Sequence, residues 1–140
     1  MSRVFVLLVA RVKVLLAGEP VKIFGDGETS RDFCYVKNVV QINLLAAIGE
    51  SSEAVDQVYN VAVNQRTSLN LLFRELCELL GVEATPEYQD FRPCDVRHSL
   101  ADISKAQRLL GYAPTHDLRT GLAEALRWYV AEYAPTDARS

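Results

Sequence analysis

The feature that most constrains the fold of this 140-residue chain is one amphipathic helix with a defined beginning and end. Between positions 69 and 80, large apolar residues recur at helical spacing opposite charged ones, so the segment must bury one face against other elements. Ser68 is a suitable N-cap, because its hydroxyl can accept a backbone N–H of the first turn. Gly81 is expected to end the helix in the left-handed conformation. The stripe is formed by Leu69, Leu72, Phe73, Leu76, Leu79 and Leu80.

Four further segments carry helical signals, which makes about four to five helices in all. The first, 4–17, is ambiguous, because its apolar spacing fits a helix whereas its valines favour a strand; we interpret it as a helix. Asn38 is expected to cap a second helix, which is largely buried. Asp102 is expected to cap a third helix over 103–110, which Gly111 ends. A last helix is expected to begin after Asp117.

Short strands are expected between the helices. Residues 21–24 and 31–35 are interpreted as a β-hairpin, because the six residues between them favour a turn. The apolar run 57–63 predicts a buried strand, and 85–88 predicts another. The predicted fold class is therefore α/β of the mixed α+β type, with short strands between helices.

Composition excludes several classes of protein. Fifteen Lys and Arg against eighteen Asp and Glu give a net charge of −3, which argues against sequence-independent nucleic-acid binding. The apolar run 4–10 is too short to span a membrane. Three cysteines without a CxxC pair predict reduced thiols, no metal site and a cytoplasmic location.

No motif for a self-contained enzyme is present. No GxGxxG follows a strand, no P-loop occurs, and none of the six tyrosines is followed by a lysine four residues later. We therefore predict no catalytic residue in this chain.

Arginines and aspartates on predicted loops are the candidate ligand-binding groups. Arg31 with Asp32, and Arg92 with Asp95, stand at strand ends or in turns. Two guanidinium forks that converge would match a diphosphate. The alternative is a set of solvated surface pairs worth under about 1 kcal/mol each.

Several motifs in order carry a family resemblance: residues 18–36 (GEPVKIFGDGETSRDFCYV), 57–63, 66–69, 95–106 and 110–114. They resemble the substrate domain of the extended short-chain dehydrogenase/reductases, the NAD-dependent nucleotide-sugar epimerases and dehydratases. The likeness is greatest to bacterial UDP-N-acetylglucosamine 4-epimerases of polysaccharide biosynthesis, and it runs from Leu16 to Tyr129.

The resemblance implies site residues. Arg31 and Arg92 would hold the diphosphate of a UDP-sugar, and Asp95 the ribose hydroxyls. Val63 would lie near the nucleotide, and Ser99 matches the family motif. Cys94 stands where the family usually has glycine. Residues 18–134 would form the substrate-binding domain, preceded by a helix over 1–17 and followed by a frayed tail at 135–140.

The resemblance also implies that a half is missing. In the family, an N-terminal Rossmann half supplies the NAD site and the catalytic Tyr-x-x-x-Lys set, so this chain would be truncated, hold no cofactor and not be catalytic alone. A separate NAD-binding half is an expected partner. A homo-oligomer is also expected, because the strand at 58–61 would otherwise be an exposed edge. The alternatives are a non-enzymatic UDP-sugar-binding module and a truncated interaction remnant.

Overall fold

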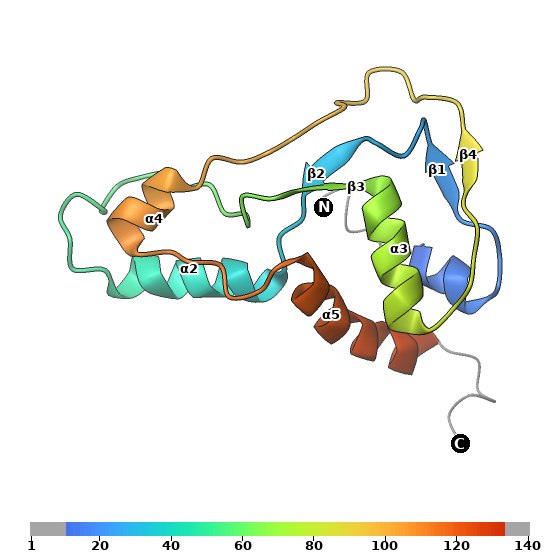
Figure 1. The fold of residues 1–140 in the computed structure, drawn as a ribbon. Coiled ribbons are helices and arrows are strands. Elements are labelled where there is room, and N and C mark those ends of the chain that lie inside the picture. Colours follow the sequence, from blue (N-terminus) through green and yellow to red (C-terminus); the bar gives the residue numbers. More distant parts are fainter. Residues whose placement is uncertain (1–10, 134–140) are drawn as a thin grey trace. The chain divides into compact units, whose positions relative to one another are not determined.

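The computed structural model describes residues 11–133, which form two compact units (Figure 1). Unit 1 comprises 11–29, Ser68–Asp95 and 122–133, and unit 2 comprises Ser30–Thr67 and Val96–Gly121. The first part of the predicted 4–17 helix and the predicted tail at 135–140 lie outside the described residues.

Unit 1 is built on two paired strands and helices. Strand β1 (Lys22–Phe24) runs parallel to β4 (Glu87–Gln89), with Ile23 opposite Tyr88. Helix α3 (Leu69–Leu80) begins at Ser68, whose hydroxyl accepts the N–H of Leu71 at 3.2 Å, and it ends at Gly81 with φ of 66°. Both predicted caps are confirmed.

The predicted first helix is confirmed in its described part. Residues 11–16 are helical, and Gly18 follows in the left-handed region with φ of 69°. The N–H of Glu19 donates to the carbonyl of Val14 at 2.9 Å, which closes the end of the helix.

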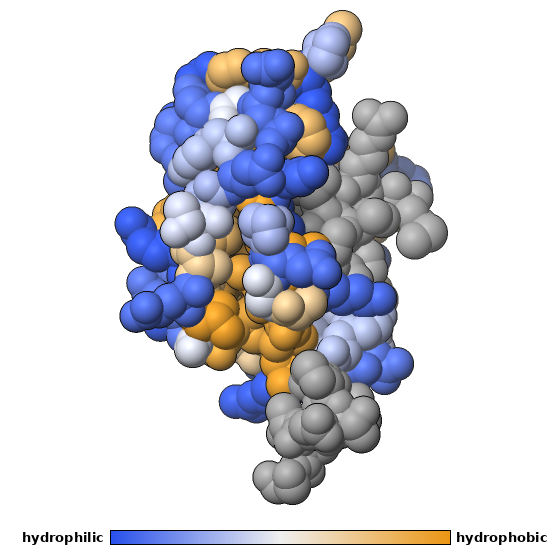
Figure 2. All heavy atoms as spheres, turned by 90° about the vertical axis from the view of Figure 1, so that its right-hand side faces the viewer, coloured by the Kyte–Doolittle hydropathy of each residue, from blue (hydrophilic) through white to orange (hydrophobic). Residues whose placement is uncertain are grey.

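The apolar core of unit 1 draws on the first helix, β1, α3 and the residues from 122 onward. Figure 2, which views the right-hand side of Figure 1, shows hydrophobic residues gathered in one area among hydrophilic ones. Trp128 is 59% exposed and packs edge-on against Tyr129 with ring centroids 5.1 Å apart. The buried residues are Val12, Leu15, Val21, Ile23, Leu72, Phe73, Leu76, Leu122, Leu126 and Tyr129.

The predicted β-hairpin is wrong, although the mixed α/β class is confirmed. Strand β1 pairs with β4, whereas β2 (Ser30–Asp32) pairs with β3 (Arg66–Ser68). The turn between β1 and β2 forms hydrogen bonds with residues distant in sequence. The Gly25 N–H donates to the Gln89 carbonyl at 2.8 Å, and the Asn70 N–H donates to the Gly27 carbonyl at 3.0 Å. These contacts separate the two strands, and local turn propensity gives no sign of them.

Unit 2 packs α2 (Val36–Ile48) against α4 (Ser104–Leu110). Gly111 ends α4 with φ of 64°, as expected from the sequence, but the helix begins one residue later than predicted, so Ile103 is its N-cap and Asp102 precedes it, accepting the N–H of Ser104 at 2.9 Å. The last helix, α5 (Leu118–Tyr133), begins after Asp117, whose carboxylate accepts the N–H of Thr120 at 2.8 Å. The core cluster of unit 2 is Ile42, Ala62, Ile103, Ala106, Leu110 and Tyr112.

The buried strand predicted over 57–63 does not form in the structure, where this segment is irregular. Val58 is 87% exposed, and only Ala62 of the segment is buried. Hydrogen bonds hold the segment instead: the side-chain amide of Asn60 donates to the Asp102 carbonyl at 3.1 Å, and the Tyr112 hydroxyl donates to the Ala62 carbonyl at 2.9 Å. Among the described residues no strand pairs with it, so its apolar side chains lack the cover that a buried strand needs.

Helix α2 differs from expectation in its cap and its exposure. It begins at Val36 after Tyr35, so Asn38 is not the cap; Asn38 lies inside the helix, fully buried. Apolar side chains four residues apart line a solvent-exposed face instead of being buried. They are Val36 (60% exposed), Val40 (52%), Leu44 (59%) and Ile48 (72%).

No helix among the described residues is long and apolar enough to cross a membrane.

Candidate functional site

Arg31 lies in the middle of β2, in unit 2, and its guanidinium is fixed by backbone carbonyls. The Nη1 atom donates to the carbonyl of Ser30 at 2.8 Å and to that of Arg97 at 3.3 Å. One nitrogen makes both bonds, and they fix the orientation of the planar guanidinium.

The segment around His98 lies beside β2 and brings Ser99 to it. Ser30 donates its N–H to Arg97 at 2.8 Å and accepts the N–H of Ser99 at 3.1 Å, in a parallel bridge between Ser30 and His98. The Ser30 hydroxyl also lies 2.8 Å from Nδ1 of His98. This contact joins residues 68 positions apart, and nothing in the local sequence indicated it.

Val63 is held from two sides. The carboxylate of Asp32 accepts the N–H of Val63 and that of Asn64, each at 3.1 Å. The Tyr112 hydroxyl donates to the carbonyl of Ala62 at 2.9 Å. Val63 therefore has a fixed place next to β2, in the same unit as Arg31 and Ser99.

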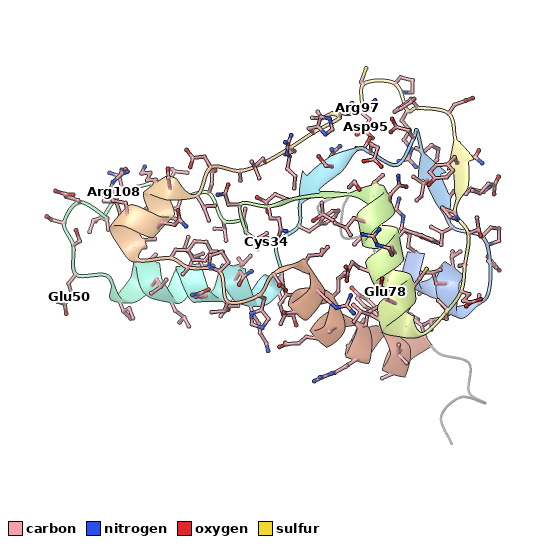
Figure 3. The ribbon with its side chains drawn as sticks, viewed as in Figure 1. Cys34, Glu50, Glu78, Asp95, Arg97 and Arg108 are labelled. Atoms are coloured by element: carbon pink, nitrogen blue, oxygen red, sulfur yellow. The ribbon has the colours of Figure 1, made fainter. Side chains whose placement is uncertain are left out.

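Tyr112 is a structural donor rather than a proton-transfer group. Burial, followed by the neighbouring Cys34, raises the pKa of Tyr112 to about 12. The phenol thus keeps its proton at physiological pH. Burial also raises the pKa of the Cys34 thiol, which lies between β2 and α2 (Figure 3), so no reactive thiolate is favoured there.

Arg92 and Asp95 lie in unit 1, on the loop after β4 (Figure 3 labels Asp95). The guanidinium carbon of Arg92 is 3.6 Å from the centroid of the Phe24 ring, a stacked cation–π contact. Asp95 N–H donates to the Arg92 carbonyl at 3.4 Å, which folds the loop into a turn. Phe24 was predicted only as part of a strand, and nothing in the sequence indicated that it would contact a candidate site residue.

Cys94 adopts the conformation that glycine adopts most easily. Its φ is 62°, in the left-handed region that side chains other than glycine visit rarely. The chain therefore keeps a left-handed turn at a position where the resembling family usually has glycine.

The Gly25–Gly27 turn does not have the form of a dinucleotide cradle. It is the only glycine pair of this kind among the described residues, and its space is filled: a side chain at Gly25 would overlap Phe91, and one at Gly27 would overlap Asn70. A dinucleotide cradle needs open backbone N–H groups at the start of a helix. No group of three or more His, Cys, Asp or Glu that could hold a metal occurs among the described residues either.

The structure thus brings Arg31, Val63 and Ser99 together in unit 2, and Arg92 and Asp95 together in unit 1. Their roles toward a nucleotide, and the convergence of Arg31 with Arg92, stay predictions.

Comparison with known proteins places the chain in a family. The model of the GDP-mannose 4,6 dehydratase family matches residues 1–125. UDP-glucose 4-epimerase of Thermotoga maritima, solved with UDP-glucose, is 37% identical, with a TM-score of 0.80 over 89% of this chain and 40% of that one.

Two further structures agree. A UDP-glucuronic acid 4-epimerase variant of Bacillus cereus, in complex with NAD and a fluorinated substrate analogue, is 30% identical, with a TM-score of 0.79 over 87% of this chain and 38% of that one. The UDP-N-acetylglucosamine 4-epimerase of Methanobrevibacter ruminantium, in complex with UDP-N-acetylmuramic acid, is 34% identical, with a TM-score of 0.77 over 89% of this chain and 39% of that one.

The chain spans 35 to 38% of the length of the curated relatives that match it first. The order of its motifs, the fold and the match over most of its length agree, so the chain belongs to the NAD-dependent nucleotide-sugar epimerase/dehydratase family of the extended short-chain dehydrogenase/reductases.

Proposed function

We propose that this chain is the UDP-sugar-binding portion of an NAD-dependent nucleotide-sugar 4-epimerase. The observation that carries the proposal is the match over nearly nine-tenths of the chain to epimerases solved with UDP-sugars. The C-terminal position of this portion, and its glucose or N-acetylglucosamine type of substrate, follow from the resemblance of the sequence motifs.

In this proposal the guanidinium groups hold the diphosphate. Arg31 and Arg92 each supply paired donors that match phosphate oxygens, and the two together contribute about 3 to 6 kcal/mol, at roughly 1.5 to 3 kcal/mol for each charged hydrogen bond. Asp95, on the same turn as Arg92, accepts from the ribose hydroxyls. Val63 and Ser99 border the nucleotide.

The chain by itself is proposed to bind without catalysing. The epimerase reaction needs a hydride acceptor and a base, and the Gly25–Gly27 turn does not have the form of a dinucleotide cradle. A separate NAD-binding half is then the partner that supplies the chemistry. The second candidate is a UDP-sugar-binding module with no enzymatic role, which is favoured because none of the tyrosines of the sequence is followed by lysine four residues later.

A homo-oligomer is the proposed state of the chain alone, in the cytoplasm. The exposed apolar face of α2 and the 87% exposed Val58 lie in the same unit and leave apolar surface in water. A second copy of the chain can cover both, because a two-fold contact repeats the same patch on each partner.

The substrate is tested by thermal shift with UDP-glucose, UDP-N-acetylglucosamine and GDP-mannose, each at the same concentration. The proposal expects the UDP-sugars to raise the melting temperature more than GDP-mannose does, because GDP-mannose offers the same diphosphate and ribose but a different base. Equal shifts from all three would contradict recognition of the UDP portion.

The enzymatic role is tested by mixing the chain with a purified NAD-binding half of a related epimerase and following 4-epimerisation of UDP-N-acetylglucosamine. Recovered turnover supports the split enzyme. Saturable UDP binding without turnover supports the non-enzymatic module.

A further inference from the structure

His98 contacts β2 through its side chain, and the proposed function gives it no role. Its Nδ1 atom lies 2.8 Å from the hydroxyl of Ser30, the first residue of β2. Ser30 is buried, whereas His98 is an exposed residue, so the contact ties a loop at the surface to the inside of unit 2. Either tautomer of the ring can form it, because a serine hydroxyl both donates and accepts.

The backbone contact at the same place is a single bridge. Ser30 and His98 are partners in an isolated parallel bridge, in which the Ser30 N–H donates to the Arg97 carbonyl at 2.8 Å. The Ser99 N–H donates to the Ser30 carbonyl at 3.1 Å. Each such bond makes a modest net contribution to stability, and no longer ladder continues this pairing. The side-chain contact of His98 is therefore a third bond beside only two.

The two carbonyls of this bridge are the ones that hold Arg31. Its Nη1 atom donates to the Ser30 carbonyl at 2.8 Å and to the Arg97 carbonyl at 3.3 Å. Arg97 is 66 positions from Arg31 in the sequence, and the bridge brings its carbonyl to β2. A shift of residues 97–99 away from β2 would therefore take one of the two acceptors from the guanidinium.

An arginine that is already oriented binds an anion more tightly than one that must first be ordered. Immobilising a long side chain costs conformational entropy, and this cost weakens binding when it arises on association. The two carbonyl contacts order the Arg31 guanidinium in the ligand-free chain. The affinity that Arg31 contributes thus depends on the bridge that holds those carbonyls.

We propose that His98 is a positioning residue for Arg31. Through the hydroxyl of Ser30 it fixes the bridge whose carbonyls orient the guanidinium for the diphosphate. The inference rests on the proposed function for the identity of the ligand and deepens it by one residue. His98 acts through Ser30 and Arg31, and not by touching the nucleotide.

The test compares His98→Leu with His98→Asn by calorimetric titration of UDP and of inorganic pyrophosphate into the full chain. Both replacement side chains branch at Cγ, but only asparagine carries polar atoms there, where histidine has Nδ1. His98→Leu is expected to lower both affinities about threefold to tenfold, and His98→Asn to recover most of the loss. Ser30→Ala should lower them by the same factor as His98→Leu, and the double variant no further, because both changes remove one contact.

Two controls separate positioning from a general effect on the fold. His116→Leu removes the other histidine of unit 2, whose Nδ1 lies 2.8 Å from the hydroxyl of the adjacent Thr115, and it should leave both affinities unchanged. In an Arg31→Ala background, His98→Leu should lower neither affinity further, because the residue through which it acts is gone.

The outcomes distinguish the inference from the proposed function. Wild-type affinity for UDP in His98→Leu would overturn the inference and leave the proposed function intact. An equal loss in His98→Leu and His98→Asn, or a further loss in the Arg31→Ala background, would assign His98 a role in the fold alone and would also overturn it. If the wild type binds neither UDP nor pyrophosphate, the proposed function is wrong and the inference is wrong with it.

Discussion

The carboxylate of Asp32 bonds to the backbone N–H groups of both Val63 and Asn64, at 3.1 Å each. It thereby joins β2 to a segment 31 residues away that forms no strand. Asn64 has φ of 58°, a left-handed conformation that bends the chain so that two successive N–H groups meet one carboxylate. This contact fixes Val63 relative to Arg31.

Asp32→Ala is predicted to destabilise the chain by about 2 kcal/mol, because two backbone donors lose a charged acceptor. Chemical denaturation measures the free energy of unfolding. Asp32→Asn should recover part of the loss, since its single carbonyl oxygen can still accept one N–H. Asp90→Ala, at an exposed position, is the control and should stay within about 0.5 kcal/mol of the wild type.

Asn38→Ala is predicted to lower the free energy of unfolding by about 3 kcal/mol. The fully buried amide donates to the carbonyl of His116 at 2.7 Å and accepts the N–H groups of Thr115 and His116 at 3.0 and 3.1 Å. Removal leaves three backbone groups without a partner.

The control for Asn38 is Asn43→Ala in the same helix, where the amide bonds only to the carbonyl of Val39 and is exposed. Equal unfolding free energies for the two alanine variants would contradict the bridging role of Asn38.

Asp117 is predicted to make helix capping depend on pH. Its bonds to Thr120 lower the pKa of the carboxyl in the folded state. The carboxylate therefore contributes stability above its unfolded pKa of about 3.9, and the contribution is lost as the pH falls through the lowered folded value. Asp117→Ala should cost about 1 kcal/mol at pH 7 and progressively less below pH 4.

The control for this effect is Asp117→Asn, because asparagine can cap the helix but has no carboxyl group to titrate. Asp117→Asn should remain near wild-type stability at pH 7. A destabilisation by Asp117→Ala that is as large at pH 2.5 as at pH 7 would count against a carboxylate cap.

Leu44→Glu is predicted to weaken self-association. Leu44 is 59% exposed in the apolar face of α2, so a charge there should disfavour burial against a second copy without disturbing the core. Light scattering at tens of micromolar should give an oligomer for the wild type and for Asn43→Glu, and a smaller species for Leu44→Glu. A wild-type monomer under these conditions would contradict the proposed oligomer.

Local signals in the sequence predicted where the helices lie, although the cap and the burial of α2 differ from the prediction. Ser68 and Gly81 are caps as expected, because capping depends on residues within one turn. Pairing between distant segments could not be predicted in this way: β1 pairs with β4 across more than sixty residues, and the turn-forming residues at 25–30 suggested a hairpin instead.

The candidate site shows the same division. Arg31 and Arg92 could be chosen from the sequence because charged forks on loops suit a diphosphate. The fixing of Arg31 by the carbonyl of Arg97, and the stacking of Arg92 on Phe24, depend on tertiary contacts and were not predicted. The prediction of a buried strand at 57–63 was wrong, because an apolar run is buried only where another element covers it.

Calorimetric titration of UDP into the wild type, Arg31→Ala and Arg92→Ala tests the central claim most directly. The account predicts saturable binding to the wild type and an affinity reduced about tenfold or more in each variant, because each loses a charged contact to the diphosphate. Absence of binding heat with the wild type, or wild-type affinity in both variants, would contradict it.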